Sequence, residues 1–176
     1  MRNVTLITTG GTIEKTYDEQ SGQLDNRRSI VRRMLRRLRL EDTTVRIIEL
    51  MSKDSLVMTD ADRRQILQVV HATVAAAGAG SLDAAGGIVI LHGTDTLCLT
   101  GDLLAREIPT PPIPIVLTGA MRPYEMTRSD ALQNLTEALF AAGTLSPGVY
   151  ATAHGRSLKF PGVRKDRDRG TFVPTA

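Results

Sequence analysis

Short apolar runs alternate with longer segments of helical periodicity along this chain, a pattern typical of β-α-β-α folds. The short runs predict strands at Asn3–Thr8, Thr44–Leu50, Gly87–Leu91, Ile113–Thr118 and Val149–Ala153. The periodic segments predict helices at Arg28–Leu38, Asp60–Ala76, Thr96–Arg106 and Asp130–Ala141. We therefore expect an α/β fold: a mainly parallel sheet with helices on both faces, in a single Rossmann-like or flavodoxin-like domain over residues 1–176.

Capping signals and helix breakers support these boundaries. Thr59 with Asp62, and Asp130 with Gln133, have the spacing of capping pairs at the starts of two predicted helices. Four prolines between residues 109 and 114 exclude a helix before the fourth strand.

Two segments fall outside the predicted helices and strands. The stretch Ala77–Gly86, rich in Ala and Gly, predicts a loop. The basic tail Lys159–Ala176, which contains Gly and Pro, is expected to lie over the surface rather than in the sheet.

Composition narrows the class of protein. No apolar run approaches the roughly 20 residues of a membrane-spanning helix, and no basic leader precedes the first strand, so a cytoplasmic protein without a membrane partner is expected. Cys98 is the only cysteine, which excludes an intrachain disulfide. The net charge is +3 and the pI about 9.3, but much of the positive charge falls on seven arginines between residues 27 and 39. These arginines predict the solvated face of an amphipathic helix. No aromatic residues lie between them to stack on bases, so no nucleic-acid partner is expected.

Two segments carry candidate chemistry, because each apolar run stops at glycine and small hydroxyl residues. They are Leu6–Ile13 and Ile88–Thr96. In an open α/β sheet this places Thr12, Thr94 and Asp95 at carboxyl ends of strands, where ligands bind. The pattern favours nucleophilic chemistry on a small polar substrate. Simpler alternatives remain open: a tight turn or an incomplete phosphate loop for the first segment, and a helix cap for the second.

Three other reactive residues give weaker evidence of function than these two segments. His92 precedes the glycine turn and is expected to hydrogen-bond the loop. His154 has no Cys or His at metal spacing, so no metal site is predicted. Cys98 is expected to be a buried, inert side chain.

The two segments closely resemble the signature motifs of bacterial-type L-asparaginases. The motifs are Thr9–Ile13 and His92–Thr96. The resemblance continues, in the same order, at Thr118–Pro123, Ser129–Ala131 and Val163–Lys165. It implies a cofactor-free amidohydrolase that converts L-asparagine and water into L-aspartate and ammonia.

The resemblance also implies the catalytic residues. Thr12 matches the threonine nucleophile, and Thr94, Asp95 and Lys165 match a second group that assists proton transfer and the attacking water. A threonine hydroxyl is a poor nucleophile at neutral pH, so such assistance is chemically necessary. Tyr17, on an expected loop, is the candidate for the active-site tyrosine. Backbone amides of the Gly10–Gly11 turn or of the Thr94 region would stabilise the oxyanion.

Substrate-holding residues follow the second predicted strand. Alignment on Met58 favours Asp54 and Ser55, and alignment on the first serine favours Ser52 and Lys53; we prefer the former. Gly11, Thr94 and Asp95 are expected to contact substrate as well. Glu14 is a further candidate for the substrate α-amino group.

The second, smaller domain typical of this family is absent from the sequence. The resemblance is therefore to a short form, in which a homo-oligomer would cover the exposed surface, or to a truncated longer product. Two other functions stay open. One is the amidase component of a tRNA-dependent amidotransferase, docked through the arginine-rich helix. The other is an amino-acid-binding module without catalysis.

Overall fold

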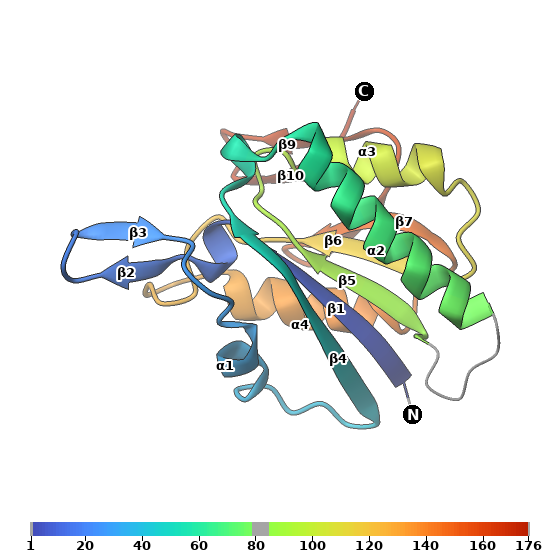
Figure 1. Ribbon diagram of the computed structural model, residues 1–176, viewed down its shortest axis with the longest axis horizontal. Coiled ribbons are helices and arrows are strands. Elements are labelled where there is room, and N and C mark those ends of the chain that lie inside the picture. The colour runs from blue at the N-terminus through green and yellow to red at the C-terminus, as the bar shows by residue number, and fades with distance from the viewer. Residues whose placement is uncertain (1, 79–84, 176) are drawn as a thin grey trace.

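The computed structural model describes residues 2–78 and 85–175, and within them six strands form one central sheet (Figure 1). The first five strands run parallel, and the last is antiparallel to its neighbour. Their order across the sheet is β4 (Thr43–Lys53), β1 (Arg2–Gly10), β5 (Gly87–Leu91), β6 (Pro114–Thr118), β7 (Gly148–Ala153) and β8 (Arg156–Lys159).

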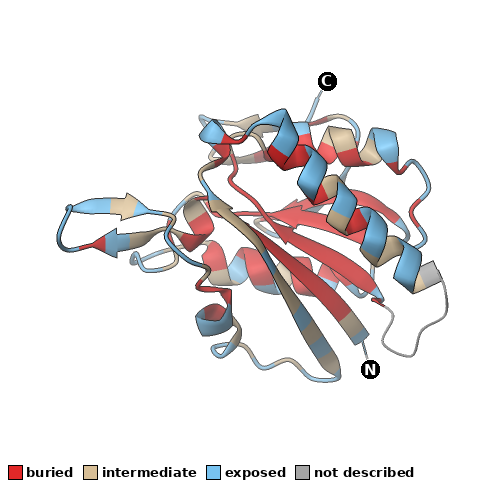
Figure 2. Ribbon diagram, in the orientation of Figure 1, coloured by how far each residue is buried: buried red, intermediate tan, exposed pale blue. Residues whose placement is uncertain are grey.

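Helices cover both faces of the sheet. Side chains of β5 alternate between two apolar clusters: Ile88 and Ile90 pack with α2 (Asp60–Gly78) and α3 (Leu97–Glu107). Val89 and Leu91 pack with α1 (Val31–Leu35) and α4 (Ala131–Ala142) on the opposite face. The central strands are buried on both sides, which explains their continuous apolar sequences (Figure 2). The α/β fold with a mainly parallel sheet is thus confirmed.

The order of the parallel strands places a topological switch point beside β1. The chain goes from β1 to β4 on one side of it, and then to β5 on the other. After β1 and β6 the chain continues to α1 and α4 on one face, whereas after β4 and β5 it continues to α2 and α3 on the other. Loops that diverge in this way leave a crevice at the carboxyl ends of the strands, where open α/β sheets bind ligands.

The chain passes to opposite faces of the sheet after β5 and after β6 because of an uncommon connection. The connections β5–α3–β6 and β6–α4–β7 step in the same direction across the sheet but pass over opposite faces. They are therefore of opposite hand, so one of them is the uncommon left-handed crossover.

All five predicted strands and the last three of the four predicted helices are present, with small shifts at their ends. Helix α1 is shorter than the predicted Arg28–Leu38. The residues expected to form its first turn bind the loop after β1 instead, because the Ser29 hydroxyl and the Ile30 amide both donate to Glu14. After Leu35 the chain continues in tight turns. The arginines on this segment are exposed, as the amphipathic pattern predicts.

Two hairpins were not predicted. The strands β2 (Thr16–Asp18) and β3 (Gln23–Asp25) pair into a hairpin that projects from the body of the molecule (Figure 1). The tail expected to lie over the surface instead supplies the end of β8 and a hairpin of β9 (Val163–Asp166) and β10 (Thr171–Pro174). That prediction was wrong because Val163 and Phe172 are buried in the same apolar cluster as α2 and α3, and Val173 is buried as well.

The capping predictions had different outcomes. Thr59 and Asp62 form the expected reciprocal pair: the Thr59 amide donates to Asp62 at 2.8 Å, and the Asp62 amide donates to the Thr59 hydroxyl at 3.3 Å. The pairing of Asp130 with Gln133 was wrong, because Asp130 accepts from the 119–122 loop instead. Most of the predicted Ala77–Gly86 loop, residues 79–84, lies outside the described residues.

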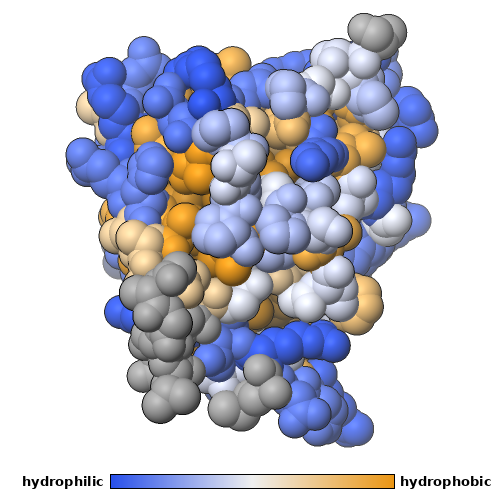
Figure 3. All heavy atoms as spheres, turned by 90° about the vertical axis from the view of Figure 1, so that its right-hand side faces the viewer, coloured by the Kyte–Doolittle hydropathy of each residue, from blue (hydrophilic) through white to orange (hydrophobic). Residues whose placement is uncertain are grey.

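The two ends of the sheet differ in character. The side of the molecule drawn in Figure 3 shows apolar surface between polar groups. At the amino ends of β1 and β4, a cavity of about 320 Å³ is lined in part by Val4 and Arg46. The candidate site residues lie at the opposite, carboxyl end. None of the helices within residues 2–78 and 85–175 combines the length and apolarity that a membrane crossing requires.

Candidate active site

Glycines bring three strand-end loops into direct contact. Gly11 has a φ of 80°, and a Cβ placed on it would lie 2.4 Å from the backbone of Gly93. A Cβ on Gly93 would lie 2.4 Å from the Ser55 hydroxyl oxygen. Only glycine permits such close approach. The loops that follow β1, β4 and β5 therefore meet, and Thr12 and Thr94 each come directly after one of the touching glycines.

Thr94, Asp95 and Lys165 form a hydrogen-bonded group. The Lys165 Nζ donates to the Thr94 Oγ1 at 2.8 Å and to the Asp95 Oδ1 at 3.0 Å. Thr94 is buried, and the two charged side chains are mostly so. Lys165 comes from β9, some 71 positions beyond Thr94. Arg167, which sequence reasoning missed, contacts the same Asp95 oxygen at 3.0 Å from a largely exposed side chain.

The loop after β4 supplies Asp54 and Ser55. Ser55 is 1% exposed, and among the described residues its hydroxyl has no hydrogen-bond partner, so a buried polar atom is left for a ligand. Burial would raise the pKa of Asp54, but its hydrogen bonds from Lys15 and the Leu56 amide, with the Lys15 charge, hold it below its usual value.

The two residues of the alternative pair, Ser52 and Lys53, have different surroundings. The Lys53 amine bonds to Asp62 at 2.6 Å, so it is directed to the start of α2. The Ser52 hydroxyl, like that of Ser55, is buried with no partner among the described residues. The geometry therefore disfavours Lys53 as a substrate-holding residue and leaves Ser52 open.

Thr12 and Tyr17 lie on different elements. Thr12 begins a short 3-10 turn (Thr12–Glu14) and is half-buried. Tyr17 lies on the projecting β2–β3 hairpin rather than on a loop, with 58% of its surface exposed. Its backbone amide donates to Glu125 at 3.0 Å, but within residues 2–78 and 85–175 its hydroxyl makes no hydrogen bond.

Glu14 has a different position from the one suggested for a substrate-binding carboxylate. It is 1% exposed and accepts from the amides of Gly10 and Ile30, both at 3.2 Å, and from the Ser29 hydroxyl. Burial, opposed by these hydrogen bonds, raises its pKa to about 7. Its carboxyl group therefore ties the loop after β1 to the start of α1.

The Gly10–Gly11 turn has no amide to spare for an oxyanion. The Gly10 amide donates to Glu14, and the Gly11 amide donates to the Lys53 carbonyl at 2.8 Å. Both donors are already satisfied, so this half of the oxyanion prediction was wrong. The backbone near Thr94 is the option that remains.

His92 and Cys98 have structural surroundings. His92 is fully buried, with its Nδ1 at 2.9 Å from the Gly93 carbonyl and its Nε2 at 2.8 Å from the Thr100 hydroxyl. Burial lowers its pKa to about 4, so the ring is neutral near pH 7. Its expected structural hydrogen bond is confirmed. Cys98 is half-buried rather than buried, and burial raises its pKa to about 11, which keeps the thiol unreactive.

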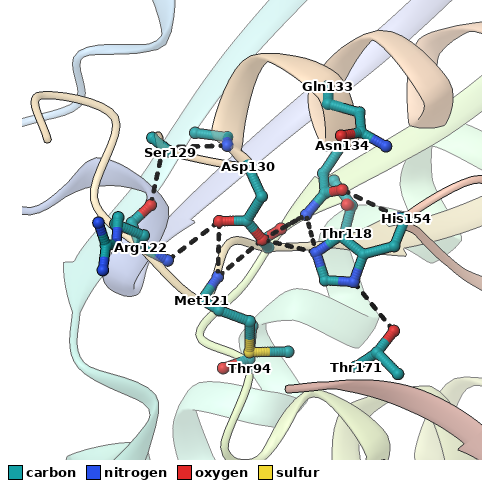
Figure 4. Close-up of polar contacts among 12 residues, drawn as sticks. Thr94, Thr118, Met121, Arg122, Ser129, Asp130, Gln133, Asn134, His154 and Thr171 are labelled. Carbon is teal, nitrogen blue, oxygen red and sulfur yellow. Dashed lines mark hydrogen bonds and ion pairs between the residues drawn. The ribbon is translucent and has the colours of Figure 1, made fainter. Parts of the chain in front are cut away.

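A second polar cluster, missed by sequence reasoning, lies beside Thr94 (Figure 4). Asp130 accepts hydrogen bonds from the Met121 and Arg122 amides, from Asn134 and from His154. Burial would raise the Asp130 pKa, but the hydrogen bonds from Met121, His154 and Arg122 hold it below its usual value. Local sequence gave Asp130 a capping role and His154 none, because most of their partners lie 8 to 24 positions away.

The arginine-rich segment lines a separate cavity of about 440 Å³. Arg33 and Arg37 face Tyr124 and Glu125 across it. The Arg33 guanidinium lies 5.3 Å from the Tyr124 ring centre and 2.9 Å from a Glu125 oxygen. Because the other Glu125 oxygen accepts from the Tyr17 amide, this cavity adjoins the β2–β3 hairpin.

Comparisons with known proteins agree with this architecture. Residues 3–169 match the family model for the N-terminal domain of asparaginase. An L-asparaginase of Thermococcus kodakarensis is 32% identical over 145 residues, which cover 82% of this chain and 42% of that protein. A component of the glutamyl-tRNA(Gln) amidotransferase of Methanococcus maripaludis is 28% identical over 161 residues, which cover 89% and 36%. The chain thus spans well under half the length of these relatives.

Solved structures lead to the same family. The thermostable L-asparaginase of Thermococcus kodakarensis superposes with a TM-score of 0.80 at 30% identity, over 93% of this chain and 47% of that one. L-asparaginase I of Vibrio cholerae shares the fold, with a TM-score of 0.76 at 24% identity, over 98% and 51%.

Proposed function

This chain belongs to the asparaginase family, and from that premise we propose that it is an amidohydrolase that converts L-asparagine and water into L-aspartate and ammonia. The observation that carries the proposal is the group formed by Lys165, Thr94 and Asp95, with contacts of 2.8 and 3.0 Å. An amine held against a buried hydroxyl beside a carboxylate is suited to proton transfer. The loop that carries Thr12 touches the loop that carries Thr94, so a candidate nucleophile lies on the adjoining loop.

The first half of the reaction forms an acyl-enzyme. The Thr12 Oγ attacks the side-chain amide carbon, its proton passes to the leaving nitrogen, and ammonia departs from an ester on Thr12. Backbone amides near Thr94 stabilise the negative charge on the amide oxygen, since those of Gly10 and Gly11 are already paired.

The second half returns the enzyme to its starting state. A water held by Thr94 attacks the ester carbon, while Lys165 and Asp95 assist removal of its proton. The Thr12 oxygen takes a proton as aspartate leaves. The sum is one asparagine and one water consumed, and one aspartate and one ammonia formed.

Substrate contacts come from the loop after β4 and from the strand ends. The buried Ser55 hydroxyl is the donor for the substrate carboxylate, and Asp54 and Asp95 are acceptors for its ammonium group. Gly11 contacts substrate through its backbone. Discrimination between asparagine and glutamine rests on one methylene of pocket depth, about 1–3 kcal/mol.

Tyr17 assists transfer of the Thr12 proton. Because its ring is exposed on the β2–β3 hairpin, this role requires the hairpin to bend toward Thr12 when substrate binds. Tyr17→Phe is therefore expected to lower kcat without unfolding the protein. Unchanged kcat in this variant would remove Tyr17 from the mechanism.

The proposal is tested by measuring ammonia release from L-asparagine with the purified chain. Thr12→Ala and Lys165→Met should each lose nearly all activity and keep the circular dichroism spectrum of the wild type. Lys159→Met, which changes an exposed lysine on β8, is the matched control. Activity that survives in both site variants would refute the assignment. Binding of aspartate without ammonia release would favour an amino-acid-binding module.

A second candidate function is the amidase step of a tRNA-dependent amidotransferase. The similarity to the glutamyl-tRNA(Gln) amidotransferase component, over 89% of this chain, favours it, and the exposed arginines of α1 offer a docking surface. The same assay decides between the two, because an independent asparaginase turns over without tRNA or a partner protein.

We also propose that the chain forms a homo-oligomer. Exposed apolar side chains beside the candidate site, Leu56 and Val57 at 67% each, are the surface that a second copy would cover. Sedimentation of a monomer at micromolar concentration would refute this.

A further inference from the structure

The Asp130 carboxylate is the centre of a network that reaches two separate parts of the candidate site. One oxygen accepts from the Arg122 amide at 3.0 Å, and the other from Asn134 at 2.9 Å and His154 at 2.8 Å. The Met121 amide donates to both oxygens. In Figure 4 these donors surround the carboxylate, and Thr94 lies just beyond Met121. A mostly buried carboxylate with this many donors is held in one orientation.

His154 continues the network in the opposite direction. Its Nε2 faces Asp130, and its Nδ1 lies 2.9 Å from the hydroxyl of Thr171. A carboxylate only accepts hydrogen bonds, so Nε2 carries a proton and, in the neutral ring, Nδ1 accepts from Thr171. Its backbone has a φ of 53° and its amide donates to Asn134, so the ring is fixed at both ends.

The two ends of this network lie on either side of Thr94. At one end, Asn134 donates to the Gly119 carbonyl at 2.9 Å. Gly119 is packed so closely that a Cβ on it would lie 3.0 Å from the Thr94 methyl group. At the other end, Thr171 begins β10, and the next residue of β10 pairs with Lys165. The Lys165 amine returns to the Thr94 hydroxyl and closes the ring of contacts.

We propose that Asp130, His154 and Thr171 are positioning residues that hold the Lys165 amine against Thr94; this inference rests on the proposed function. The β9–β10 hairpin has two short strands, and no further strand pairs with it within residues 2–78 and 85–175; two-stranded sheets are marginally stable on their own. The burial of Phe172 and Val173 holds the hairpin against the body of the protein, but apolar contacts are not directional and do not fix its exact position. The directional hydrogen bond that the Thr171 hydroxyl donates to His154 fixes where the hairpin begins, and with it the position of Lys165.

The test uses Thr171, whose hydroxyl can be removed with little change of shape. Thr171→Val removes the bond to His154, Thr171→Ser retains it, and Thr136→Val is a matched control on the exposed face of α4. We expect Thr171→Val to lower kcat about tenfold to hundredfold with KM within about twofold, since misplaced groups cost rate rather than binding. Thr171→Ser should restore kcat, and Thr136→Val should leave it unchanged.

A second measurement does not depend on turnover. The chain has four lysines, so the Lys165 ammonium signal in an NMR spectrum can be identified by its loss in Lys165→Met. We expect this signal to move in Thr171→Val and to stay in place in Thr171→Ser. His154→Gln should move it as well, and provides the same test if Thr171→Val does not fold.

The outcomes separate the inference from the proposed function. A wild type that releases no ammonia refutes the proposed function, and the Lys165 signal then decides the inference alone. An active wild type with unchanged kcat and an unmoved signal in Thr171→Val overturns the inference, even if the melting temperature falls. That result would make the network a purely structural clamp.

Discussion

Two buried titratable groups next to the candidate site should affect stability in opposite directions over the same pH range. Burial raises the pKa of Glu14 from 4.5 to about 7, so the folded protein keeps a proton that the unfolded chain loses. The contribution of Glu14 is complete below pH 4.5 and is lost as the pH rises to 7. Burial lowers the pKa of His92 from 6.5 to about 4, so its contribution is complete above pH 6.5 and is lost as the pH falls to 4.

The two effects are similar in size. Each pKa differs from its ordinary value by about 2.5 pH units, and one pH unit corresponds to about 1.4 kcal/mol, so each group changes the free energy of unfolding by about 3 kcal/mol. Glu14 is 1% exposed and His92 is 0% exposed, so solvent screens neither strongly. Between pH 4.5 and 6.5 the changes in the two contributions should nearly cancel, so these two groups together should leave the free energy of unfolding of the wild type almost constant.

Urea unfolding of the wild type, Glu14→Gln and His92→Gln, at pH values from 4 to 8, measures both effects. The stability of Glu14→Gln should rise with pH by about 3 kcal/mol between pH 4 and 6.5, because Glu14 no longer offsets the titration of His92. The stability of His92→Gln should fall by a similar amount between pH 4.5 and 7. Asp62, with a pKa of about 2, contributes only below this range. Three curves that run parallel, separated by constant offsets, would refute the reasoning.

Three further predictions concern single side chains. Thr59→Ala removes the cap of α2 and should lower the free energy of unfolding in urea by about 1 kcal/mol, whereas Thr59→Ser should restore it; equal stabilities would contradict the reciprocal pair with Asp62. Gly93→Ala places a methyl group against Ser55 and should lower both the melting temperature and the affinity for aspartate, each measured by calorimetry. Wild-type values of both would exclude the close contact. Cys98 should react with iodoacetamide at pH 8 far more slowly in the folded protein than in urea, and equal rates by mass spectrometry would mean an accessible thiolate.

The central fold was predictable because parallel strands buried on both faces have continuous apolar sequences. Gly87–Leu91 and its neighbours are such runs, ended by glycine or proline. The hairpins were not predictable in the same way. The strands β2 and β3 have three residues each and mostly exposed or half-buried side chains, so they show no periodicity. Only two residues of β10 are buried, too few to distinguish a strand from a surface tail.

The candidate site was predictable only where strand ends determine it. Thr12, Thr94 and Asp95 follow apolar strands, and parallel topology places them at one edge of the sheet. Lys165 came from family resemblance alone, because its own segment was taken for a surface tail. The amides of Gly10 and Gly11 donate to the Glu14 carboxyl group and the Lys53 carbonyl. No local sequence pattern indicates the positions of these two acceptors.

Asp130 shows how tertiary contacts override a local preference. As a cap it would accept from one amide of α4, which contributes about 1 kcal/mol. In the folded protein four donor groups surround it, and hydrogen bonds to a charged group contribute about 1.5–3 kcal/mol each. The Ser129 hydroxyl accepts from the Ala131 amide at 3.1 Å instead, so the first amide of α4 still has a partner. The carboxylate is therefore available to the loop beside Thr94, because the neighbouring serine takes the local role.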